Sequence, residues 1–307
     1  MRMVEAMSDV THVDVLVIGG GAAGLSAALV LARARRRVLV VDSGRPRNAP
    51  AEGVHGFLSR DGIAPADLRA TGRAEVERYG GRIEPGEVLA VRRVGDGFAV
   101  ELADRAVRTR RVVVATGLRD DLPDVPGLRD RWGRDVLHCP YCHGWEVRDQ
   151  PLGVLGWQPA GVHQALLLRG WSDDVVLFAE NLADADRARL AARGVAVVDG
   201  QVRGLVVEDD ALRGVQLADG TTAARSALFV PPRFRPNDAL LADLGCERDN
   251  GWVRVDPTGR TSVPGVWAAG NVVDPAEQVV NAAAAGAKAA IALNADLIEA
   301  DLLEGAA

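Results

Sequence analysis

Cysteine is scarce in this chain of 307 residues, which contains only Cys139, Cys142 and Cys246. Three cysteines are too few for the disulfide framework that stabilises small secreted domains. In a reducing compartment, two cysteines separated by two residues are more often catalytic or metal-binding than structural. The pair Cys139 and Cys142 is therefore the first candidate for chemistry.

Long apolar segments and strong clusters of positive charge are also missing. The N-terminal stretch MRMVEAMSDVTHVD has no apolar core like that of a signal peptide, and Lys288 interrupts the alanine-rich run near the C-terminus. The formal net charge is -6, and we interpret the basic stretch 33–37 as a solvated helix end because it follows an apolar helical pattern. These features predict a cytoplasmic protein that binds neither membranes nor nucleic acid.

The first recognisable pattern is a strand, a glycine-rich turn, a helix and a second strand. Residues 13–18 read VDVLVI, the run GGGAAG covers residues 19–24, and the helical pattern LSAALVLARA leads to RVLVVD, which ends at Asp42. In such a unit the first glycine permits the tight turn, the middle one lets a pyrophosphate approach the backbone, and the last lets the helix pack on the sheet. The helix N-terminus favours phosphate, and the acidic residue accepts hydrogen bonds from a ribose. The pattern predicts a dinucleotide site.

Further apolar patterns predict a second unit of the same kind. The strand RVVVATG at 111–117 ends in small residues, a new strand and helix pattern begins at Pro151, and the segment 261–271 reads TSVPGVWAAGN. Length and composition, with 48% hydrophobic and 25% charged residues, fit a soluble protein of two domains. The predicted fold class is α/β, with two Rossmann-like three-layer domains.

The order of these motifs resembles the low-molecular-weight thioredoxin reductases along essentially the whole chain. The resemblance rests on GGGAAG with Asp42, the ATG at 115–117, the Cys-x-x-Cys in mid-chain and the late PGVWAAGN. It implies a discontinuous FAD-binding domain made of residues 1–118 and 241–307. It also implies an inserted domain, residues 119–240, that carries the cysteine pair, and a homodimer.

The resemblance also implies a set of residues that hold FAD. The glycine loop and Asp42 would bind the ADP part, Gly270 would meet the ribityl chain and phosphates, and the last helix would face the flavin. Asn271 stands where the family usually has aspartate, but an amide can still bridge to hydroxyl or phosphate oxygens. The predicted FAD residues are Gly19, Gly21, Ala22, Ala23, Gly24, Asp42, Ser43, Asn48, His55, Val88, Ala115, Thr116, Gly117, Gly270, Asn271, Gln278 and Val279.

The stretch that would bind NADPH in thioredoxin reductases departs from the family pattern. It reads GWQPAG at 156–161, so Gln158 replaces the middle glycine, and Pro159 has no amide to donate. After the next strand the family has basic residues for the 2'-phosphate, whereas this chain has Glu180 and Asp184. The first and last glycines are retained, so we predict a Rossmann-like fold with a degenerate nucleotide site.

Three interpretations of LHCPYCHGWEVR at 137–148 compete: a metal clip, an inert structural disulfide and a redox dithiol. A zinc site needs four ligands in a tetrahedron, which a loop as short as His138–His143 can hardly turn inward, and there is no second cysteine pair. We therefore predict a redox dithiol and no metal.

The pattern Cys-x-x-Cys-His, together with the degraded nucleotide motif, resembles the flavin-dependent dithiol oxidases that close disulfides in natural products of the holomycin and gliotoxin type. By this resemblance Cys142 would face the flavin and Cys139 would form a mixed disulfide with the substrate. His143, where thioredoxin reductases have aspartate, would be the base, and His138 is a second catalytic candidate. The predicted reaction passes electrons from a small dithiol through the cysteine pair and FAD to O2, giving H2O2.

Two other functions stay open at this point. One is an NAD(P)H-dependent disulfide reductase of the thioredoxin reductase type, and the other is a flavin-bound redox sensor. Cys246, far from the pair in sequence, is predicted to be a packed thiol.

Overall fold

The computed structural model describes residues 11–305, which form two compact units. The first unit contains the described residues up to Ala49, Ala66–Arg119 and those from Arg235 onward. The second contains Pro50–Pro65 and Asp120–Phe234. The predicted FAD-binding part includes residues 50–65, whereas their contacts group them with the unit that carries the cysteine pair.

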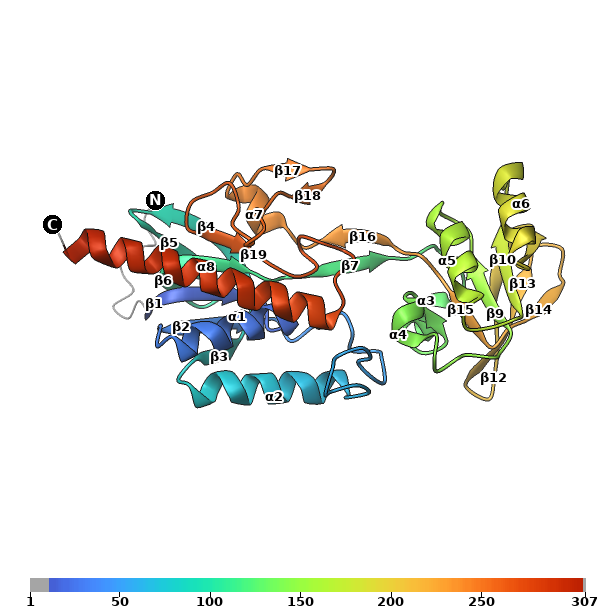
Figure 1. The fold of residues 1–307 in the computed structure, drawn as a ribbon, viewed down its shortest axis with the longest axis horizontal. Coiled ribbons are helices and arrows are strands. Elements are labelled where there is room, and N and C mark those ends of the chain that lie inside the picture. The colour runs from blue at the N-terminus through green and yellow to red at the C-terminus, as the bar shows by residue number, and fades with distance from the viewer. Residues whose placement is uncertain (1–10, 306–307) are drawn as a thin grey trace. The chain divides into compact units, whose positions relative to one another are not determined.

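The first unit is built on a seven-stranded sheet (Figure 1). Its strand order is β3-β2-β1-β6-β5-β4, and β19 also pairs with β6. β1, β2, β3, β6 and β19 pair in parallel, and β4 and β5 form an antiparallel extension. The strands are β1 (Thr11–Ile18), β2 (Val38–Asp42), β3 (Arg82–Pro85), β4 (Val88–Val94), β5 (Gly97–Leu102), β6 (Ala106–Val114) and β19 (Val266–Ala268).

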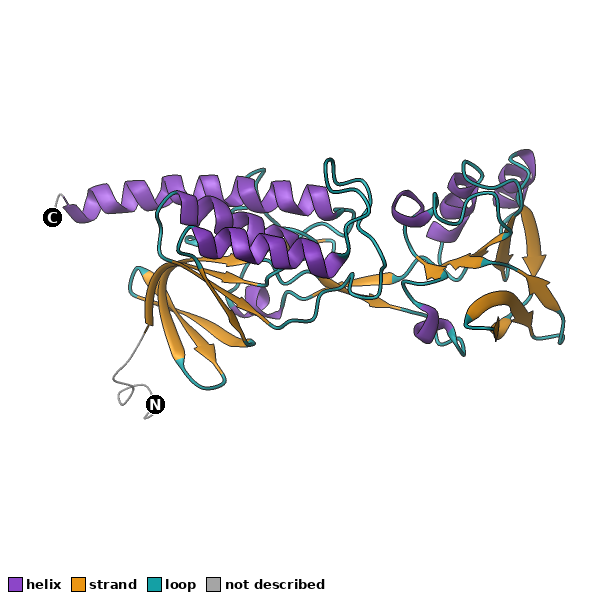
Figure 2. Ribbon diagram, turned by 90° about the horizontal axis from the view of Figure 1, so that it is seen from below, coloured by secondary structure: helices purple, strands orange, loops and turns teal. Residues whose placement is uncertain are grey.

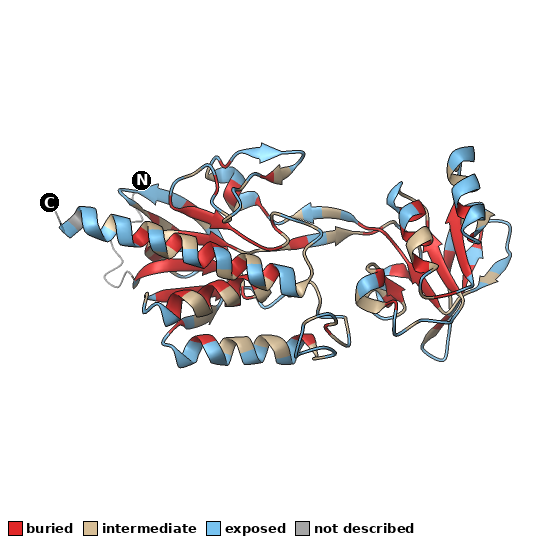
Figure 3. Ribbon diagram, viewed as in Figure 1, coloured by how far each residue is buried: buried red, intermediate tan, exposed pale blue. Residues whose placement is uncertain are grey.

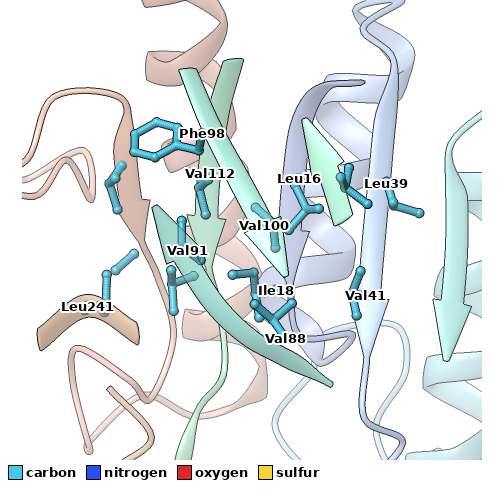
Figure 4. Packing of buried hydrophobic residues seen from close by; sticks show 14 of the residues in the cluster. Leu16, Ile18, Leu39, Val41, Val88, Val91, Phe98, Val100, Val112 and Leu241 are labelled. Atoms are coloured by element: carbon cyan, nitrogen blue, oxygen red, sulfur yellow. The ribbon is translucent and has the colours of Figure 1, made fainter. Parts of the chain in front are cut away.

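The apolar runs of the central strands are continuous because both faces of the sheet are covered. In β1, Leu16 and Ile18 point into the cluster drawn in Figure 4, whereas Val15 and Val17 point to the opposite face. Val88 is buried in the same cluster as Leu16 and Ile18. The carboxyl ends of β1, β2 and β6 lie at the same end of this buried sheet, and the glycine loop begins there.

The three longest helices beside this sheet, among the described residues, are α1 (Ala22–Arg33), α2 (Pro65–Arg78) and α8 (Val279–Gly305). Figure 2 shows the long C-terminal helix over one face of the sheet, and Figure 1 shows α8 beside α1. A Cβ added at Gly286 would lie 2.0 Å from the backbone oxygen of Ala23, so the two helices cross with no room for a side chain. Within residues 11–305, no helix is both long and apolar enough to cross a bilayer.

The second unit has a parallel five-stranded sheet in the order β11-β10-β9-β15-β8 and a separate three-stranded sheet, β12-β13-β14. Figure 3 shows β9 and β10 buried, while α6 is largely exposed. The elements are β8 (Val136–Leu137), β9 (Leu152–Leu155), α5 (Ala160–Leu168), β10 (Val175–Ala179), α6 (Asp184–Ala192), β11 (Ala196–Asp199), β12 (Val202–Glu208), β13 (Ala211–Leu217), β14 (Thr222–Ala224) and β15 (Ala227–Phe229).

Short elements complete the chain. β7 and β16 pair with each other and carry the chain between the units. These elements are β7 (Leu118–Asp121), α3 (Leu128–Arg131), α4 (Pro140–His143), β16 (Arg233–Pro236), α7 (Ala239–Asp243), β17 (Arg248–Asp249) and β18 (Trp252–Val253). The predicted α/β class with two Rossmann-like parts is confirmed.

Candidate active site

The glycine loop between β1 and α1 is shaped by packing on one side and is open on the other. Gly19 has a φ of +106°, and a Cβ there would lie 2.4 Å from the backbone oxygen of Ala115. A Cβ at Gly24 would lie 1.9 Å from the backbone oxygen of Gly19, so the helix needs this glycine to approach the strand. A Cβ at Gly21, in contrast, would meet nothing within 4 Å. Gly21 therefore faces free space at the N-terminus of a helix of twelve residues, where a phosphate fits.

Asp42 is fixed at the end of β2, next to the loop. Its Oδ1 accepts a hydrogen bond from the amide of Gly20 at 3.2 Å, and its Oδ2 lies 3.6 Å from Nη1 of Arg73. Ser43 follows as an exposed residue. A carboxylate held in this position can accept hydrogen bonds from a ribose diol.

A second loop, after β6, adjoins the first. The amide of Ala115 donates to the oxygen of Ile18 at 2.8 Å. The hydroxyl of Thr116 donates to the backbone oxygen of Asn237 at 2.7 Å, and the Asn237 side chain donates back to the Thr116 oxygen at 3.0 Å. A Cβ at Gly117, which has a φ of +66°, would meet nothing within 4 Å. Asn237 thus clamps a loop that is open to a ligand at Gly117.

The late turn between β19 and α8 closes on itself through Asn271. Its Nδ2 donates to the backbone oxygens of Asp274 and Glu277 at 3.0 and 2.9 Å, and its Oδ1 accepts from Arg47 at 3.4 Å. An aspartate has no N–H to donate to these two carbonyls. The amide is therefore suited to this turn, although it was singled out as a departure from the family pattern.

Glu277 has an orphaned polar atom in the same turn. Its Oε2 is buried, has no hydrogen-bond partner within residues 11–305, and would lie 3.9 Å from a Cβ at Gly270. Burial, reinforced by the charge of Asp274, raises the pKa of the Glu277 carboxyl. A protonated carboxyl can donate a hydrogen bond to an acceptor on a ligand.

These features fit the ADP part and the phosphates of FAD. The open Gly21, the fixed Asp42, the open Gly117 and the orphaned carboxyl oxygen all belong to the first unit. Ala22 and Ala23 begin α1, Gln278 precedes α8, and Val279 begins it. Asn48 is also in the first unit, whereas the side chain of Val88 is packed in the core.

In the second unit, Cys139 and Cys142 form a disulfide with their Cα atoms 5.2 Å apart. The short helix α4 carries the loop, and the amides of Cys142 and His143 both donate to the oxygen of Cys139, at 3.1 and 3.2 Å. A Cβ at Gly144 would lie 2.5 Å from the oxygen of Pro140. The loop that carries the disulfide therefore needs a glycine at position 144, directly after His143.

His143 is half-buried, and both nitrogens of its ring are buried. Among the described residues, neither Nδ1 nor Nε2 has a hydrogen-bond partner. Burial lowers the pKa of the imidazole, against the opposing charge of Glu146, and His55 lowers it further. A neutral imidazole without partners can accept a proton from a thiol close to the disulfide.

The other two histidines singled out from the sequence also lie in the second unit. The ring of His138 makes an edge contact with Phe234, with 5.2 Å between the ring centroids. His55, one of the predicted FAD residues, has its Nε2 3.5 Å from Oε1 of Glu146, three residues beyond His143. The structure therefore brings His55 next to Glu146.

The second glycine loop, between β9 and α5, is filled by its own side chains. Nε1 of Trp157 and Nε2 of Gln158 both donate to the backbone oxygen of Pro231, at 2.8 and 2.9 Å. A Cβ at Gly161 would lie 2.9 Å from the Cα of Gly156, so packing alone requires a glycine there. Glu180 and Asp184 are exposed after β10. This loop keeps the glycines that the fold needs and lacks the one that a pyrophosphate needs.

Cys246 is a free thiol buried in the core of the first unit, as predicted. Burial raises the pKa of this thiol, so it is a poor nucleophile.

Residues 13–286 match the family of pyridine nucleotide-disulphide oxidoreductases. This chain belongs to that family. The thioredoxin reductase tcpT of Claviceps purpurea (strain 20.1) is 35% identical over 313 residues, which cover 95% of this chain and 97% of tcpT. The thioredoxin reductase sirT of Leptosphaeria maculans is 33% identical over 312 residues, which cover 94% and 95%. The crystal structure of HlmI superposes with a TM-score of 0.94 at 60% identity and covers 96% of this chain and 95% of its own.

The predicted likeness to thioredoxin reductases is thereby confirmed, and the site of this disulphide oxidoreductase contains residues that the sequence did not reveal. Asn237 and Glu277 act through contacts that join distant segments, and no local pattern marks such contacts. Glu146 follows His143 by three positions, but α4 ends at His143, so no helical spacing marks this residue. Gln278, the neighbour of Glu277, was predicted, but burial of the glutamate could not be predicted from the sequence.

Proposed function

We propose that this protein is an FAD-dependent dithiol oxidase that closes a disulfide in a small natural-product dithiol. The electrons of the substrate pass to the Cys139–Cys142 disulfide. A bound FAD would supply the two-electron acceptor for the reduced cysteine pair, with O2 as the final oxidant and H2O2 as the product. The whole reaction consumes one dithiol and one O2 and yields one disulfide and one H2O2. We also propose, from the family resemblance, that the enzyme acts as a homodimer.

The observation that carries this proposal is the filled second glycine loop. Trp157 and Gln158 hydrogen-bond to Pro231 where a nicotinamide dinucleotide would need open backbone, and Pro159 supplies no amide. An enzyme that cannot take electrons from NAD(P)H needs another donor. The cysteine pair is a chemically suitable entry point, because a dithiol reduces a disulfide directly.

In the proposed reaction one substrate sulfur attacks Cys139 and forms a mixed disulfide, and Cys142 leaves as a thiolate. The second substrate sulfur then attacks the first, which closes the substrate disulfide and releases Cys139. His143 takes the proton of an attacking thiol, because only thiolates attack efficiently. The neutral, partner-free imidazole described above suits this role.

The surroundings of the cysteines favour a small ring-containing substrate. Tyr141 lies between the two cysteines in sequence and Trp145 follows closely, and these residues are 66% and 64% exposed. Tyr141 packs edge-on against Trp171, with 5.6 Å between the centroids, so its ring is held in place. Held aromatic faces beside a disulfide can stack on a planar heterocycle.

The second candidate is a disulfide reductase, and it is favoured by the name thioredoxin reductase carried by the relatives tcpT and sirT. It needs a reductant that the filled loop does not bind. A protein donor or NADH bound elsewhere would have to supply the electrons.

Aerobic turnover distinguishes the candidates. With dithiothreitol as the substrate, the holoenzyme should consume O2 and form H2O2 in a ratio of one to one. Cys142→Ser should abolish this turnover, because a single cysteine forms a mixed disulfide but cannot deliver an electron pair. Cys246→Ser, a change at a buried thiol outside the pair, is the matched control and should keep it. Turnover of Cys142→Ser at the parent rate would contradict the proposal.

A further inference from the structure

Asp42, the residue expected to hold the adenosine ribose of FAD, is fixed by several contacts at the end of β2. Its Oδ1 accepts a hydrogen bond from the amide of Gly20 at 3.2 Å. A Cβ at Gly20 would lie 2.6 Å from Cγ of Asp42, so a glycine there leaves room for the carboxyl group. The backbone oxygen of Asp42 accepts from the amide of Gly86 at 3.0 Å. These contacts fix the backbone and Oδ1, and they leave Oδ2 to be oriented by another group.

Arg73 of α2 is the group that approaches this second oxygen. Its Nη1 lies 3.6 Å from Oδ2 of Asp42, which is an ion-pair distance. The side chain of Asp42 is 14% exposed and that of Arg73 is 33% exposed. Water and salt therefore screen this pair less than they screen a pair on the open surface.

Packing fixes the part of α2 that carries Arg73. A Cβ at Gly72 would lie 3.2 Å from Cδ1 of Leu25, so α2 approaches α1 closely at the residue before Arg73. Val76, three positions after Arg73, is fully buried. The guanidinium therefore reaches Asp42 from a packed helix that lies against the helix of the glycine loop.

A carboxylate at a ribose site has an electrostatic cost that a neighbouring cation can offset. The carboxylate accepts hydrogen bonds from a diol, but its charge repels the negative charges of a nearby pyrophosphate. The guanidinium of Arg73 opposes that repulsion. Because it approaches Oδ2 while the Gly20 amide binds Oδ1, it also restricts rotation of the carboxyl group.

We propose that Arg73 is a positioning residue for FAD, which orients the carboxylate of Asp42 toward the adenosine ribose and offsets its charge beside the pyrophosphate. The effect of Arg73 on the cofactor passes through Asp42. The pattern of strand, glycine turn, helix and strand ends at Asp42, so it assigns no role to a residue of α2.

This inference rests on the FAD that the proposed function requires, but not on the direction in which electrons flow. An oxidase and a reductase of this family would both need the cofactor in the first unit. A protein that binds FAD and responds to changes at Arg73 as stated below, but consumes no O2 with dithiothreitol, would refute the oxidase and support this inference.

The first test is the affinity of the full-length protein, freed of flavin, for FAD, followed by the change in flavin fluorescence. Arg73→Gln should weaken FAD binding about five- to tenfold. Arg73→Lys keeps the charge without the planar fork and should restore part of the loss. The matched control is Arg78→Gln, which removes the same charge from the same helix, where the guanidinium lies over the ring of Tyr79. It should change the affinity by less than about twofold.

A double-mutant cycle tests whether Arg73 acts through Asp42. In the background of Asp42→Asn, Arg73→Gln should change the affinity for FAD by less than about twofold, because the carboxylate that it orients is gone. A loss of the same size in both backgrounds would mean that Arg73 acts on the cofactor or on the fold without Asp42. That result would overturn the proposal.

Displacement of FAD by two nucleotides separates positioning from packing. ADP has the ribose diol, whereas 2',3'-dideoxy-ADP lacks both hydroxyls. The parent should prefer ADP by about tenfold or more, since the dideoxy compound leaves the carboxylate without its hydrogen bonds. Arg73→Gln should lose most of this preference, whereas a packing defect would weaken both nucleotides alike. An unchanged preference in Arg73→Gln would overturn the proposal.

Discussion

The glycine loop of the first unit leaves Gly21 open, whereas the loop of the second unit is filled by Trp157 and Gln158. Both loops follow a buried parallel strand and precede a helix, and both keep the last glycine, Gly24 or Gly161, where helix and strand have no room for a side chain. The difference lies at the middle position. A packing glycine is retained by the fold alone, and a middle glycine is needed only for a pyrophosphate.

The two units therefore differ in what their loops can hold. The first unit has the shape to hold a dinucleotide, and the second keeps the Rossmann-like fold as a support for the cysteine pair. Electrons would then enter at the disulfide.

The largest effect should come from giving the first loop the middle residue of the second loop. Gly21→Gln should leave the protein essentially free of FAD, because the side chain and its bulk occupy the place of the pyrophosphate. The fold should survive, since a Cβ at this position meets nothing within 4 Å. Flavin absorbance per chain and far-UV circular dichroism measure the two effects. Full FAD content in this variant would mean that the open space at Gly21 is not a phosphate site.

The next largest effect concerns the base in the second unit. His143→Gln should slow reduction of the enzyme by dithiothreitol by about 10²-fold, the usual scale for a positioned acid or base. FAD content should not change, because His143 and the glycine loop belong to different units. Stopped-flow absorbance under anaerobic conditions gives the rate. A parent rate in His143→Gln would reduce this residue to a packing role.

The pH dependence follows from the lowered pKa of His143. The base accepts a proton only when it is neutral, and burial places its pKa below the ordinary value of about 6.5. After correction for the thiolate fraction of the substrate, the rate should be flat between about pH 7 and 8 and should fall only below about pH 6.5. The folded state also binds this proton less tightly than the unfolded chain, so the same burial destabilises the fold as the pH falls through that range. A rate that continues to rise from pH 7 to 8 after correction would point to another base.

The smallest effect should come from opening the second loop. Gln158→Gly removes one hydrogen bond to Pro231 and adds backbone freedom, which should lower the free energy of unfolding by about 1–2 kcal/mol. Trp157 still donates to the same oxygen, and Pro159, Glu180 and Asp184 still oppose a nucleotide. Urea denaturation gives the stability, and NADPH should still fail to reduce the flavin. Rapid reduction by NADPH would show that one glycine was the whole difference.

Sequence patterns could predict what is local in this molecule. Continuous apolar strands, glycine turns and a cysteine pair are each contained in a few residues, so the α/β class and the dinucleotide loop could be predicted. The antiparallel strands β4 and β5 and the sheet β12-β13-β14 were not predicted, because their half-exposed patterns are weaker than those of strands buried on both faces.

Contacts between distant segments account for what the sequence did not reveal at the site. His55 is one of the residues predicted to border FAD, and its Nε2 lies 3.5 Å from Oε1 of Glu146, 91 positions later in the chain. Asn271 looked like a departure from a pattern, but its amide supplies two N–H groups to the turn that it closes. Such roles depend on which segment packs opposite, and no spacing rule contains that information.

The most direct test of the central claim is the identity of the reductant under anaerobic conditions. The purified yellow holoenzyme is mixed with NADPH, with NADH or with dithiothreitol, and the flavin absorbance band is followed in a stopped-flow instrument. Both nicotinamides should leave the band unchanged, the dithiol should bleach it, and air should restore it with formation of H2O2. Rapid stoichiometric bleaching by NADPH would rule out the dithiol oxidase and would support the reductase instead.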